Sequence, residues 1–138
     1  MIQKETKKEQ LISSQLALSQ YSKSLGITID MMSESCAILR LMPKEEVMNA
    51  FGIIHGGVIA TLADTCMGMI LRAANVPSVT LELAINYLNV TKPGDKLIAE
   101  GQVVHFGGTV ITTQCLISTE DGSKIAFAKG TFFHRKPR

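Results

Sequence analysis

The chain of 138 residues has the size of one domain, and 46% hydrophobic residues suffice for a core without disulfides or a structural metal. Its 14 basic and 12 acidic residues are spread along the chain and give a net charge of +2, which argues against a nucleic-acid partner. The three cysteines, Cys36, Cys66 and Cys115, are an odd number at irregular spacing, which fits neither a disulfide framework nor a zinc site. We therefore expect a cytoplasmic protein that binds no metal.

Residues 4–23 predict a surface helix, in which Leu11, Ile12, Leu16 and Leu18 form a partial apolar stripe among charges and glutamines. The segment lacks the long apolar stretch of a signal peptide. Nowhere in the chain do we find a run that approaches the ~18 apolar residues of a membrane span. We therefore expect a packing helix or lid, and no membrane span.

Two short apolar runs follow, at 26–32 and 36–42, separated by Ser-Glu-Ser. Their length and the polar break between them predict a pair of strands. Pro43 ends the second run.

Residues 49–74 predict one long helix, entered through His55-Gly56-Gly57 and apolar on every side except at Asp64. Burying an ionised carboxylate costs several kcal/mol unless it is paired. A structural partner would be a backbone N–H or Arg72, but Arg72 lies eight residues further on, beyond the reach of a helical pair. Asp64 is thus a candidate functional residue.

The second half of the chain predicts four strands joined by short turns, at 78–88, 97–106, 109–119 and 124–134. Short turns require antiparallel neighbours, so we expect these strands to follow one another in a meander. In the first of these strands polar and apolar residues alternate, which places Thr80, Glu82 and Asn86 on one face and an apolar set on the other. That expected buried set is Val79, Leu81, Leu83, Ile85 and Tyr87.

A helix that is apolar all round has to be wrapped rather than laid on a sheet. We therefore expect an α+β fold in which a curled antiparallel sheet of about five to six strands surrounds one central helix, with the N-terminal helix outside. The chain would be a single domain over 1–138, with the N-terminal helix in 1–24 and the core in 25–134.

Asn49, the His55-Gly56-Gly57 motif and Asp64 stand at a distinctive spacing ahead of this strand pattern. Together, from about residue 25 to residue 134, they resemble the hotdog-fold acyl-CoA thioesterases of the phenylacetic-acid-degradation type. The resemblance implies hydrolysis of an acyl-CoA without a cofactor.

The resemblance also implies roles for individual residues. The Gly56 N–H would polarise the thioester carbonyl, and Asn49 would help to hold that carbonyl or the attacking water. Asp64 would be the nucleophile or the general base, supplied by the opposite subunit, and Thr80 stands where some members carry a serine that orients the water. Substrate contacts are implied at His55, Gly57, Gly107 and Gly108, with His55 in a mainly structural role.

Thioester hydrolysis itself needs hydrogen-bond donors at the carbonyl oxygen and a base or nucleophile at the carbonyl carbon. The first N–H groups of a helix are free donors, and its dipole favours developing negative charge. Gly56 and Asp64 are separated by eight residues, or roughly 12 Å along a helix, so one chain cannot bring both to one thioester. A two-fold homodimer with shared active sites removes the difficulty.

The resemblance further implies a homotetramer, as a dimer of dimers, and acyl-CoA as the partner molecule. The CoA phosphates need cations near the cleft, and the sequence leaves Lys92, Lys96, Lys129 and Arg135 as candidates.

Three alternatives remain at this point. A hotdog hydratase or dehydratase would pair a catalytic histidine with a carboxylate, and a non-catalytic acyl-CoA-binding module would keep the cleft alone. Cys66 could also act as a nucleophile with His55 as its base, but it lies two positions from Asp64, on nearly the opposite helix face. A buried structural thiol is the interpretation we favour for Cys66.

Overall fold

The computed structural model describes residues 18–134. These residues form an α+β fold, as expected. In chain order the elements are α2 (Gln20–Ser24), β1 (Ile27–Met32), β2 (Cys36–Leu41), the short 3-10 helix η1 (Glu45–Val47), α3 (Gly56–Ala73), β3 (Ser78–Tyr87), β4 (Leu97–Phe106), β5 (Val110–Thr119) and β6 (Lys124–His134).

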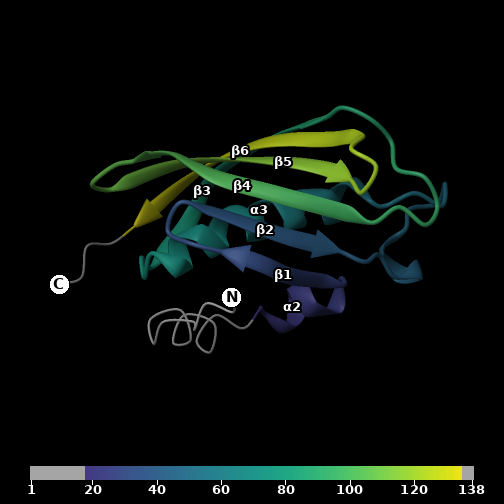
Figure 1. Cartoon of the computed structure of the whole chain (residues 1–138), viewed down its shortest axis with the longest axis horizontal. Helices are drawn as coiled ribbons and strands as arrows, with labels where there is room; N and C mark the ends of the chain where they lie inside the picture. Colours follow the sequence, from purple (N-terminus) through teal and green to yellow (C-terminus); the bar gives the residue numbers. More distant parts are fainter. Residues whose placement is uncertain (1–17, 135–138) are drawn as a thin grey trace, which may run out of the picture.

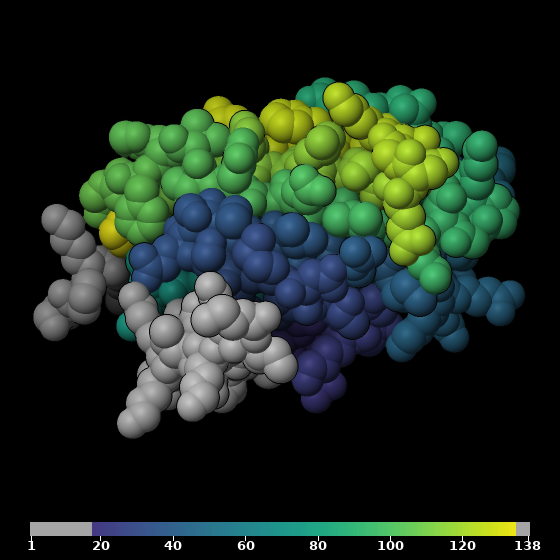
Figure 2. All heavy atoms as spheres, in the orientation of Figure 1, coloured from purple at the N-terminus to yellow at the C-terminus, as the bar shows by residue number. Residues whose placement is uncertain are grey.

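The six strands form one antiparallel sheet in the order β1-β2-β4-β5-β6-β3. The sheet curls around α3, which contacts every strand (Figure 1). In the space-filling view, β1, β2, β4 and β5 make up most of the face turned to the viewer, and α3 is almost hidden behind them (Figure 2). The expected wrapping of one long helix by a curled sheet is confirmed.

The expected four-strand meander is wrong for its first strand. β4, β5 and β6 follow one another as neighbours, but β3 pairs with β6 and not with β4. The connection from β3 to β4, residues 88–96, therefore passes the ends of β5 and β6. It is long enough for this crossing, and β3 becomes an edge strand of the sheet.

The expected alternation of β3 is also wrong in its first half. Thr80 pairs with Phe132 and Glu82 with Thr131, so Leu81 is an extra residue in a β-bulge. The bulge changes which side chains face α3, and Val79 and Leu81 are 62% and 57% exposed instead of buried. As a result Thr80 faces the helix.

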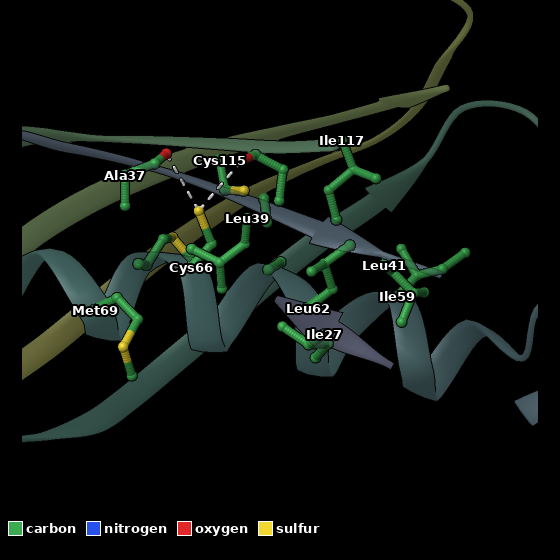
Figure 3. Packing of buried hydrophobic residues seen from close by; sticks show 14 of the residues in the cluster. Ile27, Ala37, Leu39, Leu41, Ile59, Leu62, Cys66, Met69, Cys115 and Ile117 are labelled. Atoms are coloured by element: carbon green, nitrogen blue, oxygen red, sulfur yellow. Dashed lines mark hydrogen bonds between the residues drawn. The ribbon is translucent and has the colours of Figure 1, made fainter. Parts of the chain in front are cut away.

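The core lies between α3 and the inner face of the sheet. Ile59, Leu62 and Cys66 of α3 point toward side chains of the sheet such as Leu39 and Ile117 (Figure 3). All five are at most 3% exposed. Burying one such side chain contributes about 1.5–3 kcal/mol, so this contact is the main source of stability.

α3 is not buried on all sides, in contrast to the expectation. Thr61, Asp64, Thr65 and Gly68 are half-buried and Arg72 is exposed, so one stripe of the helix is left uncovered by the sheet. By length and composition α3 could cross a membrane, with 18 residues and a mean hydropathy of 1.2, and it is the one such helix in the described part of the chain. The expectation that no run reaches that length was therefore wrong, although the curled sheet already covers the apolar side of this helix.

The predicted N-terminal helix is shorter than expected where the structure describes it. Ser19 has a non-helical backbone and caps α2, which begins at Gln20 and ends at Ser24. Leu18 is buried, as the apolar stripe suggested, but it precedes the helix. Residues 4–17 of the prediction lie outside the described residues.

Candidate active site

The first half of the candidate site is the N-terminus of α3. His55 is the N-cap residue, and its Nδ1 accepts a 2.9 Å hydrogen bond from the Gly57 N–H. In a neutral imidazole this leaves the proton on Nε2. Within residues 18–134, no hydrogen bond uses the Gly56 N–H as donor, so this N–H is open at the positive end of the helix dipole.

Asn49 lies beside this helix end because the chain folds back on itself before α3. Met48 and Ile54 form an isolated antiparallel bridge, and the His55 N–H donates to the Val47 carbonyl at 2.9 Å. Asn49 Oδ1 accepts from the Phe51 N–H at 2.9 Å and stabilises the turn between them. The oxygen of the side-chain amide is thus occupied by the turn, which leaves its NH2 group to act toward a ligand.

The second half of the candidate site lies two turns further along α3. The Thr80 hydroxyl donates a 2.8 Å hydrogen bond to Asp64 Oδ1. Both side chains line a cleft of about 500 Å³, together with Met69, Arg72 and Val79 among others. The carboxylate that the sequence marked out is therefore half-buried, hydrogen-bonded and accessible from a cleft.

These two halves are separate within one chain. Gly56 and Asp64 occupy the first and ninth positions of α3, and a helix rises 1.5 Å per residue, which places them roughly 12 Å apart along its axis. The structure brings Asp64 together with Thr80, and it places Asn49 in the turn that leads into α3. It does not bring the two halves together in one protomer.

The predicted substrate contacts are located as follows. The Gly57 N–H is already used by the His55 cap. Gly107 and Gly108 form the turn between β4 and β5. His134 forms a hydrogen bond with this turn and pairs with Ser78, the first residue of β3. The turn therefore lies at the end of the sheet where β3 begins. A Cβ on Gly107 would lie 2.4 Å from the Val110 carbonyl oxygen, so the hairpin itself requires glycine there.

Tyr87 is a residue of this region that sequence reasoning missed. It is the last residue of β3, whereas Thr80 lies near the beginning of that strand, before the bulge. The Tyr87 hydroxyl donates a 2.6 Å hydrogen bond to the Gly56 carbonyl. Burial raises the pKa of Tyr87, which keeps the phenol protonated and able to donate. The alternating pattern predicted a buried Tyr87, which was wrong, because the side chain is 51% exposed and lies against the first turn of α3. Only the three-dimensional contact reveals its partner.

Cysteine and metal chemistry find no support in the geometry. Cys66 is fully buried and its thiol lies within 3.5 Å of the Ala37 carbonyl and 3.6 Å of the Ala99 carbonyl. A hydrogen bond with Cys66 and burial raise the pKa of Cys115, which disfavours its thiolate. Among the residues that the structure describes, no cluster of three or more His, Cys, Asp or Glu side chains could hold a metal ion.

Two of the histidines contact backbone atoms of the same chain. His55 accepts from a backbone N–H, and His134 Nε2 lies 3.1 Å from the Gly107 carbonyl. No hydrogen bond in the described range 18–134 joins a histidine to a carboxylate.

Comparison with known proteins agrees with the arrangement of these elements. Residues 51–126, which include α3, the candidate residues from Gly56 to Tyr87 and most of the sheet, match the model of the thioesterase superfamily. The chain belongs to this superfamily. It is a thioester hydrolase with a hotdog fold, which confirms the family resemblance seen in the sequence.

Three relatives show the range of the superfamily near this chain. A protein of Halobacterium salinarum, provisionally named an esterase, is 32% identical over an alignment of 124 positions, which covers 78% of this chain and 80% of that protein. Human acyl-coenzyme A thioesterase 13 is 27% identical over 76% of this chain and 77% of its own length. Acyl-coenzyme A thioesterase PaaI of Escherichia coli K12 is 28% identical over 79% and 78%.

Solved structures show the same fold. A hypothetical thioesterase of Streptococcus pneumoniae TIGR4, solved with coenzyme A, is 28% identical with a TM-score of 0.77, over 81% of this chain and 88% of that one. The PaaI protein of Escherichia coli is likewise 28% identical with a TM-score of 0.77, over 83% and 86%. Two further structures of the pneumococcal protein carry alanine in place of an aspartate and of a threonine that lie 16 residues apart in it.

Proposed function

We propose that this thioesterase hydrolyses an acyl-CoA to the free acid and CoA, with water as the second substrate and no cofactor, in active sites shared by two copies of the chain. The observation that carries the proposal is the separation of the two half-sites. One end of α3 presents an open N–H, and its middle presents a hydrogen-bonded carboxylate that lines a cleft, roughly 12 Å away along the helix axis.

The chemistry assigned to each half follows from its groups. The Gly56 N–H, and the NH2 group of Asn49, would donate to the thioester oxygen as it becomes negative. Asp64 of the other copy would activate water or attack the carbonyl carbon itself, and the Thr80 hydroxyl would hold the carboxylate and orient the water. The pneumococcal relative, altered at an aspartate and a threonine with the same 16-residue separation as Asp64 and Thr80, supports this pairing.

The edge strand β3 supports the shared site. Its outer side has no strand partner among the described residues, and the apolar side chains Val79, Leu81 and Leu88 on and beside it are 62%, 57% and 48% exposed. If β3 pairs antiparallel with its own copy about a two-fold axis, the Thr80 end of one strand lies beside the Tyr87 end of the other. Asp64 of one copy then approaches Gly56 of the other.

Two clefts fit the two parts of an acyl-CoA. Beside Asp64, the side chains of Met69, Val79 and Phe132 offer apolar walls to an aromatic or a medium- to long-chain acyl group. Beside Asn49, a cleft of about 710 Å³ has Lys96 on its wall, the one candidate cation for the CoA phosphates that lines it. Arg135 lies outside the described residues. The relatives named as acyl-CoA thioesterases, and the neighbour solved with coenzyme A, support this substrate class.

We further propose that the whole chain acts as one domain, in the cytoplasm, and that two dimers associate into a tetramer. The three cysteines are free, which suits a reducing compartment.

Subunit complementation tests the shared site. Asp64→Asn and Asn49→Ala each disable both sites of a homodimer, but a mixed dimer keeps one intact site. Co-expression of equal amounts should therefore restore about a quarter of wild-type activity, since about half of the dimers are mixed. Activity is read from CoA release with a thiol reagent, over a panel of acyl-CoAs. No recovery in mixed dimers that form normally would overturn the shared site.

A wild-type protein that binds acyl-CoAs tightly without releasing CoA would instead make the chain a binding module.

Incorporation of ¹⁸O from water into Asp64 in a single turnover would identify direct attack by the carboxylate, through an anhydride.

A further inference from the structure

The first peptide unit of α3, which joins Gly56 to Gly57, is held at both ends by side chains. The Tyr87 hydroxyl donates to its carbonyl oxygen at 2.6 Å, and His55 Nδ1 accepts from its N–H at 2.9 Å. The two side chains come from different parts of the fold, since Tyr87 stands at the end of β3 and 31 residues beyond Gly56.

Without the His55 side chain, the N–H of this peptide would have no partner within the helix. Glycine explores more backbone conformations than any other residue, and here two glycines follow one another. A planar peptide that is bonded at both its oxygen and its N–H can no longer rotate freely about the adjoining single bonds.

We propose that Tyr87 and His55 are positioning residues that clamp the Gly56–Gly57 peptide and thereby aim the Gly56 N–H at the thioester oxygen. The inference rests on the proposed function. The Gly56 N–H belongs to the preceding peptide, and its direction is set by the backbone angles of Gly56, which the clamp fixes. A donor for the oxyanion has to lie about 2.7–3.1 Å from the position that the oxygen occupies in the transition state, so small misalignments are costly.

The space around the two glycines fits the clamp. A Cβ at Gly56 would lie 3.4 Å from the Tyr87 ring, and a Cβ at Gly57 would lie 3.1 Å from His55 Nδ1. The first is an ordinary contact, whereas the second would push the imidazole away from its hydrogen bond. Both clamping side chains thus lie directly against the peptide that they hold.

Tyr87→Phe tests the carbonyl side of the clamp, because it removes the hydroxyl and keeps the ring. We expect kcat to fall roughly tenfold to hundredfold, below the loss for a deleted oxyanion donor, while KM changes little. Tyr21→Phe is the matched control: it also removes a phenol from a hydrogen bond, the 3.2 Å contact with Thr61. The Thr61 hydroxyl donates to the Gly57 carbonyl, which belongs to the next peptide unit and not to the clamped one. Equal kcat values for both variants and the wild type would overturn the clamp.

His55 tests the N–H side through rescue by another N-cap residue. His55→Ala removes the acceptor and should lower kcat, whereas His55→Asn restores a side-chain oxygen that can cap the helix and should recover most of it. If His55 instead transfers a proton in the reaction, His55→Asn stays as slow as His55→Ala and one limb of the pH–rate profile disappears. That result would overturn the positioning role.

Amide exchange separates this inference from the proposed function. In ¹⁵N-labelled protein, the Gly57 amide should exchange its hydrogen faster in His55→Ala and in Tyr87→Phe than in the wild type or in Tyr21→Phe. This measurement needs no substrate, so it decides on the clamp even if the protein hydrolyses no acyl-CoA. Unchanged exchange in both clamp variants, at unchanged melting temperatures, would overturn it.

Discussion

Thr80 and Asp64 lie 16 residues apart in the chain, yet the Thr80 hydroxyl donates a 2.8 Å hydrogen bond to Asp64 Oδ1. The contact joins the middle of α3 to the edge strand β3 and depends on the bulge at Leu81, which turns Thr80 toward the helix. The same strand carries Tyr87 to the beginning of α3. A single strand therefore serves both halves of the candidate site.

Replacement of Asp64 by Asn should abolish most of the turnover while leaving the fold intact. The amide oxygen can still accept from Thr80, but it can neither take a proton nor attack a carbonyl. We expect kcat to fall by roughly a hundredfold to ten-thousandfold. Calorimetric titration with a slowly hydrolysed acyl-CoA should show retained binding, and a variant that keeps wild-type kcat would exclude Asp64 from the chemistry.

The hydroxyl of Thr80 can be separated from its methyl group. Thr80→Ser keeps the donor and should retain most activity, whereas Thr80→Val keeps the shape and loses the hydrogen bond. Because a hydrogen bond to a charged group contributes about 1.5–3 kcal/mol, we expect Thr80→Val to lose roughly tenfold to hundredfold in kcat/KM. Equal kinetics for the serine and valine variants would mean that the hydroxyl has no role.

Tyr87 should ionise later than a free tyrosine in a spectrophotometric titration at alkaline pH. Burial raises the pKa of Tyr87 above its ordinary value of 10.0, so its phenol stays neutral to higher pH than a free tyrosine. Its contribution to stability is complete below pH 10 and is lost as the pH rises through the raised pKa. The difference in absorbance between the wild type and Tyr87→Phe reports the Tyr87 phenol alone, and its midpoint should lie above pH 10.0. A midpoint at or below this value would contradict the assignment.

Acid stability should depend on the turn before β6. A hydrogen bond from the Thr119 hydroxyl, followed by one from the Ser123 N–H, holds the pKa of Asp121 below its ordinary value of 3.8. This carboxylate therefore stabilises the fold above that value, and the contribution is lost as the pH falls through the lowered pKa. Urea unfolding of Asp121→Asn between about pH 2 and pH 6 should show a weaker pH dependence than the wild type. An identical slope would exclude the contribution of Asp121.

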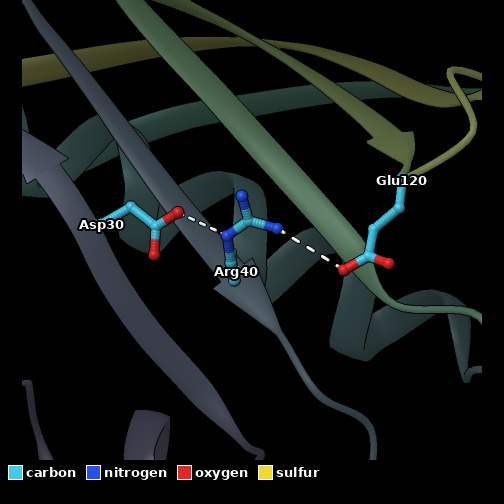
Figure 4. Close-up of polar contacts among 3 residues, drawn as sticks. All are labelled: Asp30, Arg40 and Glu120. Carbon is cyan, nitrogen blue, oxygen red and sulfur yellow. Dashed lines mark hydrogen bonds and ion pairs between the residues drawn. The ribbon is translucent and has the colours of Figure 1, made fainter.

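A surface ion-pair network should make stability depend on salt. Arg40 of β2 contacts Asp30 of β1 and lies 3.6 Å from Glu120, beyond the end of β5 (Figure 4). Exposed pairs of this kind contribute little and are screened by salt. Arg40→Gln should lower the melting temperature slightly at low ionic strength, and the difference from the wild type should vanish in 1 M NaCl. A salt-independent difference would indicate lost packing instead.

Much of this fold could be predicted from local sequence patterns. His55-Gly56-Gly57 marks the beginning of α3, and the turns around residues 107–108 and 121–123 mark the strands β4, β5 and β6. These features depend on residues close together in the chain, because the period of apolar side chains and the backbone freedom of glycine act locally. The family resemblance singled out Asp64 and Thr80, and the two side chains are in contact in the folded chain.

The partner of β3 and the bulge at Leu81 could be recognised only in the folded chain. Every strand has similar hydrogen-bonding edges, so the pairing of β3 with β6 instead of β4 follows from how the whole sheet closes around α3. The bulge arises from that pairing and reverses the alternation in the first half of the strand. Because these contacts link residues distant in the chain, they alone turned Thr80 toward Asp64 and placed Tyr87 against Gly56.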